Sequence, residues 1–254
     1  MLFRSVQHPI IRRALELFDE TRTDPQIEIT TVADIPAGTG LGSSSAFTVA
    51  LLSALSVFYD TKYTRDELAD MAIRIERSVA LTGRQDQYSA VWGGLSLIRM
   101  GGDEWAHRAE LRLPPHIMAR LRDRLMLFYT GVMHEAPAAL VGQGTATDNL
   151  HEVKAVGICT AQALSDEAFE MLGRCFNLQW TLKEMRCPSP SSICDLRVRA
   201  LDHGANGVKL IGAGEGGFLL CDTDEPHQLR YEMEGHATEL SYQWDTEGVK
   251  VLLS

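Results

Sequence analysis

Three glycines at alternate positions stand directly before three serines and an apolar helical run in the segment IPAGTGLGSSSAFTV, residues 35–49. A helix N-terminus presents unpaired N–H groups with a partial positive charge, and glycine lets an anion come close to the backbone. Phosphate fits this chemistry, and the serine hydroxyls add groups that can bind phosphate or a metal ion. A tight turn with an N-cap serine and no ligand is the alternative interpretation.

The spacing distinguishes this loop from two common nucleotide-binding motifs. No lysine follows Gly42, so the segment is not a Walker A loop. The glycines follow the order G-x-G-x-G, which also differs from the G-x-G-x-x-G fingerprint of dinucleotide-binding folds.

Two later segments carry further candidate groups. RQDQYSAVWGG, residues 84–94, places the carboxylate of Asp86 among polar neighbours in a predicted turn before a strand, with Arg84 two positions away. KLIGAGEGGFLL, residues 209–220, contains a second glycine-rich turn. A plain hairpin turn does not require so many glycines, so this turn is a second candidate for close approach of a ligand.

Alternating helical and strand patterns must position these groups. A capping-box pattern formed by Thr64 and Glu67 opens a helix whose inner face is expected to carry Leu68, Ala72, Ile75 and Val79. Hydrophobic periodicity predicts further helices at residues 7–18, 43–59 and 153–186, the last with a break near residues 164–166, and strands at residues 27–32, 94–100, 125–131 and 248–253. Residues 207–221 predict two strands around the second glycine turn. The mixture indicates an α+β protein.

Composition limits the classes of function. The chain has 254 residues, of which 45% are hydrophobic and 23% charged, as in ordinary globular proteins. No apolar run reaches the roughly 18 residues of a membrane span, and the net charge of -10 argues against a nucleic-acid surface. Five cysteines without a CxxC pair indicate reduced thiols and a cytoplasmic location.

The three glycine- and aspartate-bearing segments, in this order, resemble the GHMP kinase superfamily of galactokinase, homoserine kinase, mevalonate kinase and phosphomevalonate kinase. QHPIIRRALEL and LMLFYTG further resemble its branch that acts on D-glycero-D-manno-heptose 7-phosphate. The resemblance implies a two-lobed GHMP kinase fold. Residues 1–124 would form a lobe like domain 2 of ribosomal protein S5, and residues 125–254 a ferredoxin-like lobe.

The resemblance also implies an activity. An enzyme of this family would transfer the γ-phosphate of ATP to a hydroxyl, here the anomeric hydroxyl of a heptose 7-phosphate-like sugar, with Mg²⁺ as cofactor. ATP and a sugar phosphate are the expected partners, together with a homo-oligomeric state. A catalytically impaired nucleotide- or sugar-phosphate-binding protein is one alternative. A GHMP kinase for another sugar or polyol, or a decarboxylase of the mevalonate type, is the other.

Individual roles follow from the same resemblance. Asp86 would act as catalytic base, with Arg84 beside it stabilising the transferred group. Ser44 and Glu76 would hold the magnesium ion, an interpretation that competes for Glu76 with a solvated helix charge. The ATP-binding residues would be Pro36, Gly38, Gly40, Leu41, Gly42, Ser43, Ser44, Ser45, Gly212, Gly214 and Gly216.

Three features depart from the family pattern. Relatives begin with a further strand and glycine-rich segment, and only the four residues MLFR precede SVQHPII in this sequence, so we expect a truncated N-terminal lobe with an exposed sheet edge. Glu215 stands where many relatives have glycine, and its charge is unfavourable near phosphates. His134 stands where relatives often have an arginine, and histidine is a weaker phosphate ligand at neutral pH.

Overall fold

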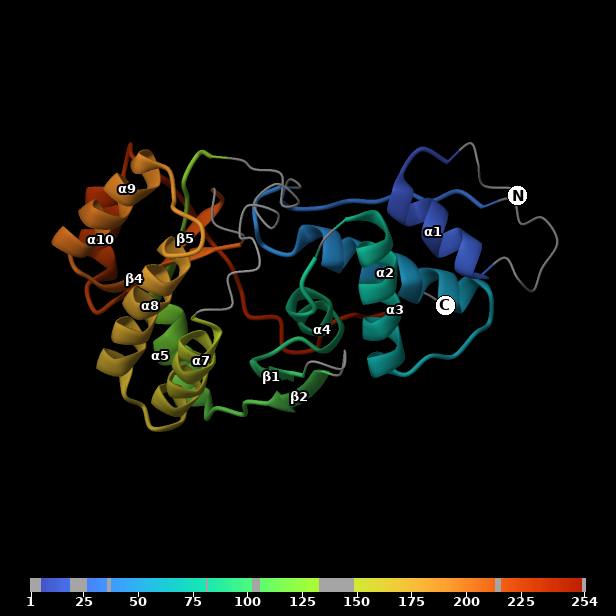
Figure 1. Ribbon diagram of the computed structural model, residues 1–254, viewed down its shortest axis with the longest axis horizontal. Coiled ribbons are helices and arrows are strands. Elements are labelled where there is room, and N and C mark those ends of the chain that lie inside the picture. The colour runs from blue at the N-terminus through green and yellow to red at the C-terminus, as the bar shows by residue number, and fades with distance from the viewer. Residues whose placement is uncertain are drawn as a thin grey trace. The chain divides into compact units, whose positions relative to one another are not determined.

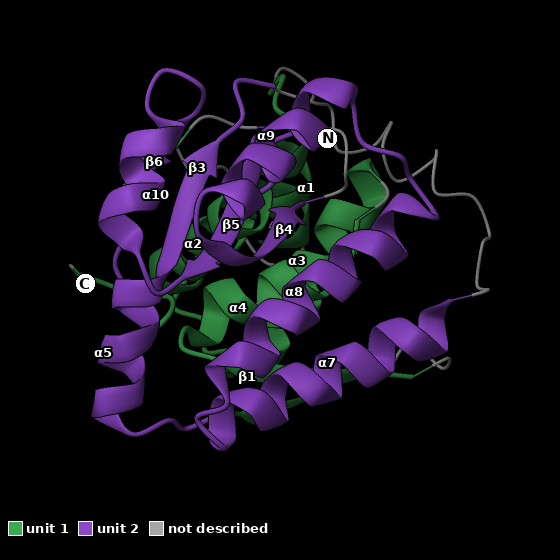
Figure 2. Cartoon of the chain, turned by 90° about the vertical axis from the view of Figure 1, so that its left-hand side faces the viewer, with its two compact units in different colours: residues 1–37, 42–110, 244–254 green, residues 38–41, 111–243 purple. Residues whose placement is uncertain are grey.

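The computed structural model describes residues 6–18, 27–35, 38–80, 82–101, 106–132, 149–212 and 216–252. The chain forms two compact units, shown in different colours in Figure 2. Unit 1 contains residues 1–37, 42–110 and 244–254, and unit 2 contains residues 38–41 and 111–243. The glycine loop is therefore divided, since its residues 38–41 pack with unit 2. The lobe boundary expected between residues 124 and 125 stays a prediction.

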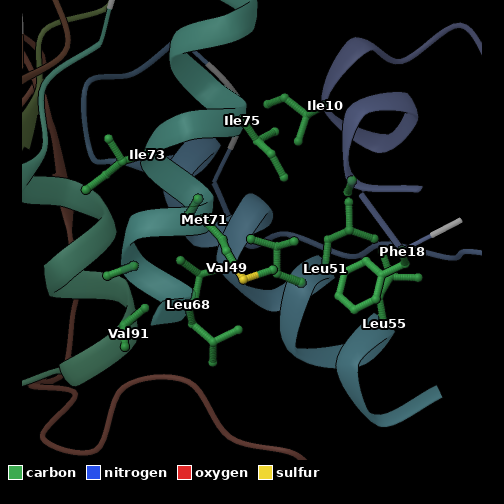
Figure 3. Close-up of a cluster of buried hydrophobic side chains, with 14 of the residues drawn as sticks. Ile10, Phe18, Val49, Leu51, Leu55, Leu68, Met71, Ile73, Ile75 and Val91 are labelled. Atoms are coloured by element: carbon green, nitrogen blue, oxygen red, sulfur yellow. The ribbon is translucent and has the colours of Figure 1, made fainter. Parts of the chain in front are cut away.

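Unit 1 is built from four helices and a hairpin among its described residues (Figure 1). The helices are α1 (Pro9–Phe18), α2 (Ser43–Phe58), α3 (Arg65–Val79) and α4 (Gln85–Trp92), and the hairpin joins β1 (Ser96–Met100) to β2 (Ala106–Glu110) in antiparallel order. Figure 3 shows side chains from all four helices meeting in one apolar core. Leu52 and Val91 at its centre are fully buried. α2 is apolar on most sides, as its sequence predicts for a buried helix.

The capping box of α3 is confirmed. The Thr64 hydroxyl accepts a hydrogen bond from the Glu67 backbone N–H at 3.2 Å, and the Glu67 carboxylate accepts one from the Thr64 N–H at 2.7 Å. Leu68, Ala72 and Ile75 are buried as expected. Val79 is 39% exposed, contrary to the prediction, because it is the last residue of the helix and projects beyond the core.

Two predicted strands of unit 1 are absent from the described residues. Residues 27–33 form no strand, since no described segment pairs with them, although Ile27 and Ile29 still pack against the core. Residues 248–252 also form no strand; the Asp245 carboxylate accepts hydrogen bonds from the N–H groups of Glu247 and Gly248 and turns the chain there. Alternating side chains alone do not make a strand without a hydrogen-bonded neighbour.

Unit 2 contains a four-stranded antiparallel sheet in the order β4-β5-β3-β6. Its strands are β3 (Leu125–Tyr129), β4 (Ala205–Ile211), β5 (Phe218–Thr223) and β6 (Thr238–Leu240). This order and the helices between β3 and β4 and between β5 and β6 are those of a ferredoxin-like fold. The predicted strand pair around the second glycine turn is β4 and β5, so that prediction is confirmed.

Helices pack around the sheet of unit 2. They are α5 (Pro115–Arg124), α7 (Leu150–Ser165), α8 (Phe169–Glu184), α9 (Ser191–Asp202) and α10 (Pro226–Met233). α8 and α9 pack against β4 (Figure 1), and α7 lies against α8. The break expected near residues 164–166 separates α7 from α8. None of the helices in the described ranges combines the length and apolar character needed to cross a membrane.

A buried ion pair fastens α5 to β5. The Arg124 side chain, 8% exposed, donates from Nε to Asp222 Oδ1 at 2.9 Å and from Nη2 to Oδ2 at 3.0 Å. A third contact joins Arg124 to the more exposed Asp224. The Asp222 side chain is fully buried, so its carboxylate depends on this guanidinium for charge compensation.

Replacing Arg124 by glutamine is expected to lower the free energy of unfolding by about 3–5 kcal/mol, because an uncompensated charge is left inside the protein. Arg230→Gln is the matched control. It removes the pair of Arg230 with Glu239, whose side chains are 49% and 30% exposed, and should cost at most about 1 kcal/mol. Urea unfolding followed by circular dichroism measures the free energy of unfolding of both variants. Equal losses would contradict the conclusion that Asp222 depends on Arg124 for charge compensation.

Candidate active site

The glycine loop adopts the backbone conformation that its composition predicts. Gly38, Gly40 and Gly42 have φ angles of 80°, 81° and 73°, in the left-handed region that favours glycine. Gly42 is the N-cap of α2, and no side chain in the described part of the chain caps the first turn of this helix. The loop therefore leads into a helix N-terminus without a side-chain cap, the arrangement to which anions bind. Pro36 lies outside the described residues.

The first part of the loop packs backbone to backbone against the second glycine turn within unit 2. A Cβ atom on Gly212 would lie 2.8 Å from the Cα of Gly40, and one on Gly217 would lie 2.4 Å from the carbonyl oxygen of Thr39. The structure thus brings together Gly40 and Gly212, two of the predicted ATP-binding glycines. Gly216 lies in the same turn, where a Cβ would be 2.6 Å from the carbonyl oxygen of Val132. Gly214, Glu215 and His134 lie outside the described residues.

Lys183, in the last turn of α8, supports the second glycine turn and was not predicted. Its ammonium group donates to the carbonyl oxygen of Leu210 at 3.0 Å and also to that of Gly212. Burial, with the charge of Lys209 nearby, lowers the pKa of Lys183 to about 8. The sequence holds only a weak signal for this role, a basic residue at the end of a helix.

Asp86 lies in the first turn of α4, whereas the sequence predicted a turn without a helix. The helix forms because Tyr88 and Val91 pack into the core and Gly93 ends it with a φ of 63°. The Asp86 side chain packs against Gly42, where a Cβ atom would lie 3.3 Å from the Asp86 Cβ. Burial raises the pKa of Asp86, and a hydrogen bond with Gln85 opposes that shift.

Arg84 precedes α4 as its N-cap residue and is 9% exposed. Arg84, two positions before Asp86 in the sequence, is therefore largely out of solvent in the structure. Its predicted role beside Asp86 stays a prediction. Surface arginines are mostly exposed, so the burial of Arg84 argues against the alternative that it is a surface residue.

Glu76 is a buried carboxylate on α3, not the solvated helix charge of the alternative interpretation. It is 4% exposed. The hydroxyl groups of Ser44 and Ser45 donate to its Oε2 at 3.3 and 3.1 Å, and its Oε1 has no hydrogen-bond partner among the described residues. Burial raises the pKa of Glu76, and the negative charge of Asp86 adds to that shift. Unit 1 thus brings together Ser44, Ser45, Glu76 and, through Gly42, Asp86.

These oxygen atoms fit a magnesium ion. Mg²⁺ prefers oxygen ligands, and it is commonly held by one or two carboxylates with substrate phosphates and water completing its shell. Ser44 and the unpartnered oxygen of Glu76 supply this kind of ligand. Within the described ranges no cluster of three or more His, Cys, Asp or Glu side chains could hold a metal, so such an ion would depend on a phosphate ligand.

A segment near the C-terminus holds the end of α4, a contact the sequence did not predict. The N–H of Gly94 donates to the carbonyl of Asp245 at 2.7 Å, and the N–H of Val249 donates to that of Val91 at 3.3 Å. The backbones approach so closely that a Cβ on Gly248 would lie 2.3 Å from the Val91 carbonyl oxygen. Residues 245–249 therefore help to position the helix that carries Asp86.

Residues 9–94, which contain the glycine loop, Glu76 and Asp86, match the family described as GHMP kinases N terminal domain. This segment is a GHMP kinase N-terminal domain. The predicted resemblance is confirmed, and the segment that carries the match includes the N-terminus of α2, the buried carboxylate of Glu76 and the partly buried carboxylate of Asp86. The GHMP domain thus holds the candidate residues that unit 1 assembles.

Curated relatives match beyond the GHMP domain. The D-glycero-alpha-D-manno-heptose 7-phosphate kinase of Campylobacter jejuni is 27% identical over 265 residues, which cover 98% of this chain and 76% of the relative. The mevalonate kinase of Pyrococcus abyssi is 28% identical over 83% of this chain and 64% of its own length. The chain spans 22% of the L-fucokinase/L-fucose-1-P guanylyltransferase of Bacteroides fragilis.

Solved structures show the fold. A D-glycero-D-manno-heptose 1-phosphate kinase from Bacteroides thetaiotaomicron superposes with a TM-score of 0.77 at 23% identity, over 96% of this chain and 75% of the other. A mevalonate kinase superposes with a TM-score of 0.65 at 20% identity, over 91% of this chain and 73% of the other. The predicted α+β, GHMP kinase fold is confirmed.

Gly42→Ala is expected to lower the free energy of unfolding by about 1–3 kcal/mol, because an L-residue is strained at positive φ and its Cβ would press on Asp86. Gly83→Ala is the matched control, since nothing lies within 4 Å of the added Cβ and no positive φ occurs there. That change should leave stability unchanged or raise it by up to about 1 kcal/mol. Thermal and urea unfolding measure the stability of both variants. Similar changes in the two variants would refute the claim that position 42 requires glycine.

Glu76→Gln is expected to remove the fall in stability with rising pH that the raised pKa of Glu76 produces. Because the pKa of Glu76 is raised in the folded protein, the folded state binds more protons than the unfolded state between the ordinary and the raised pKa, and stability falls as pH rises through that window. The glutamine variant lacks this fall. Urea unfolding of both proteins from about pH 4 to pH 8 tests this, and parallel curves would contradict the assigned burial.

Proposed function

We propose that this chain is an ATP-dependent sugar kinase that transfers the γ-phosphate to the anomeric hydroxyl of a heptose 7-phosphate-like sugar. The observation that carries the proposal is the assembly in unit 1 of an uncapped helix N-terminus, a serine paired with a buried glutamate, and Asp86 against Gly42. The similarity to the heptose 7-phosphate kinase of Campylobacter jejuni over 98% of the chain supports this choice of substrate class.

The glycine loop binds the phosphates of ATP in this proposal. Backbone N–H groups from Gly42 to Ser45, at the start of α2, bind the anion, and the positive end of α2 adds a favourable field. Gly38, Gly40 and Leu41 stay predicted contributors. Left-handed φ angles at the three glycines let these N–H groups approach without a side chain in the way. Gly212, Gly214 and Gly216 stay predicted contributors from the second glycine turn.

Ser44 and Glu76 hold the magnesium ion that accompanies ATP. When bound, the ion neutralises negative charge on the phosphates during transfer. The Glu76 carboxylate keeps one oxygen occupied by the two serine hydroxyls and the other without a partner among the described residues. This division of roles leaves one oxygen for the ion.

Asp86 orients the acceptor hydroxyl and takes its proton as the new bond to phosphorus forms. Its raised pKa makes the carboxylate a better proton acceptor than an exposed aspartate. Phosphoryl transfer depends mostly on positioning and charge neutralisation, so the proton transfer is one contribution among several. Arg84 is the proposed stabiliser of charge on the transferred group. The cytoplasmic location and the homo-oligomeric state stay predictions.

The direct test is ³¹P NMR of the purified protein with Mg-ATP and a panel of acceptors. D-glycero-D-manno-heptose 7-phosphate leads the panel, and fucose and mevalonate are included because fucokinase and mevalonate kinases are also similar to this chain. A new sugar 1-phosphate resonance together with ADP is the expected result. Turnover of mevalonate alone would assign a different acceptor, and nucleotide binding without turnover of any acceptor would favour the impaired binding protein.

Asp86→Asn is expected to lower kcat by about 10²–10⁴-fold, because the amide cannot accept the proton of the acceptor hydroxyl. Mg-ATP binding, measured by calorimetry, should be largely retained. Ser89→Ala on the exposed side of the same helix is the control and should leave both quantities unchanged. Undiminished turnover in the asparagine variant would remove Asp86 from the mechanism.

A further inference from the structure

The side chain of Gln87 is fully buried, and its polar atoms lack a hydrogen-bond partner in the described part of the chain. Its exposed fraction is 0%, and neither its amide nitrogen nor its amide oxygen has a hydrogen-bond partner among the described residues. An unsatisfied buried polar group costs about 1–3 kcal/mol of stability. Buried polar side chains in native proteins are nearly always paired, so one without a partner needs an explanation such as a ligand, an ion or a catalytic role.

The position of Gln87 supplies that explanation. It follows Asp86 in the first turn of α4, and its amide lies close enough to Glu76 to lower the pKa of that carboxylate, against the effect of burial. The Oε1 atom of Glu76 is also buried and has no hydrogen-bond partner within the described ranges. Two buried side chains, each with polar atoms that lack a hydrogen-bond partner among the described residues, therefore lie near each other. The Ser44 and Ser45 hydroxyls bind the other oxygen of Glu76.

We propose that Gln87 is a positioning residue of the cation and nucleotide site: its amide orients the Glu76 carboxylate toward a divalent cation that accompanies the nucleotide phosphates. The inference rests on the proposed function and adds to it a residue that touches the metal ligand rather than the metal. A neutral amide suits this role. A carboxylate would add a third negative charge beside Glu76 and Asp86, and an apolar side chain would leave Glu76 without a polar neighbour on that side.

The test compares the wild type with Gln87→Met, a replacement of similar length that removes both polar atoms. Electron paramagnetic resonance of Mn²⁺ measures cation affinity in the presence of a non-hydrolysable ATP analogue, and calorimetry measures binding of the analogue in EDTA. Loss of a residue that orients a metal ligand typically weakens metal binding about tenfold or more. We expect that loss for Mn²⁺, unchanged binding in EDTA, and a melting temperature of the unliganded protein that is equal or higher.

Ser56→Ala is the control, because Ser56 is buried at 8% exposure near the other end of α2. It should change neither Mn²⁺ nor nucleotide binding. Wild-type Mn²⁺ affinity in Gln87→Met would overturn the inference. A lower melting temperature with equal losses of binding in the presence and absence of metal would also overturn it, since that result indicates a structural role. A wild-type protein that binds no Mn²⁺ with nucleotide would instead refute the cation in the proposed function.

Discussion

The Glu76 carboxylate inside the helical core of unit 1 is the interaction on which the candidate site depends. Its Oε2 atom accepts hydrogen bonds from Ser44 and Ser45 at the start of α2, and Gln87 of α4 lies beside it. Three helices that are separate in sequence are therefore oriented around one negative charge. Because burial makes that charge unfavourable, the surrounding polar groups offset part of its cost, and a bound cation would offset more.

Stability and function place opposite demands on this region. The apolar side chains of α1 to α4 form a core that stabilises unit 1, whereas Glu76 and Gln87 leave buried polar atoms unpaired within the described residues. Apolar residues at these two positions would be easier to bury. Sites that bind charged ligands commonly keep such groups, because the ligand supplies the missing partners.

Close backbone contacts form the second constraint. Gly40 lies against Gly212 and Gly248 lies against Val91 at distances that leave no room for a Cβ atom. The first contact joins the two glycine segments within unit 2, and the second joins residues near the C-terminus to the helix of Asp86 within unit 1. Both contacts replace side-chain packing by backbone packing, so the segments that carry the candidate ligands are positioned by their own main chains.

Local patterns in the sequence determined much of this protein. The alternate glycines before α2, the capping box at Thr64 and Glu67, and the strand pair around the second glycine turn depend on contacts between near neighbours in the chain, and the structure contains all three. Only the tertiary structure decided the features that depend on distant partners. Residues 27–33 form no strand because none of the described segments pairs with them. α4 is a helix because Tyr88 and Val91 pack into the core, and Gln87 lies near Glu76 because α3 and α4 pack together. Periodicity and spacing describe one segment at a time, whereas strand pairing and burial are properties of segments that meet only in the folded chain.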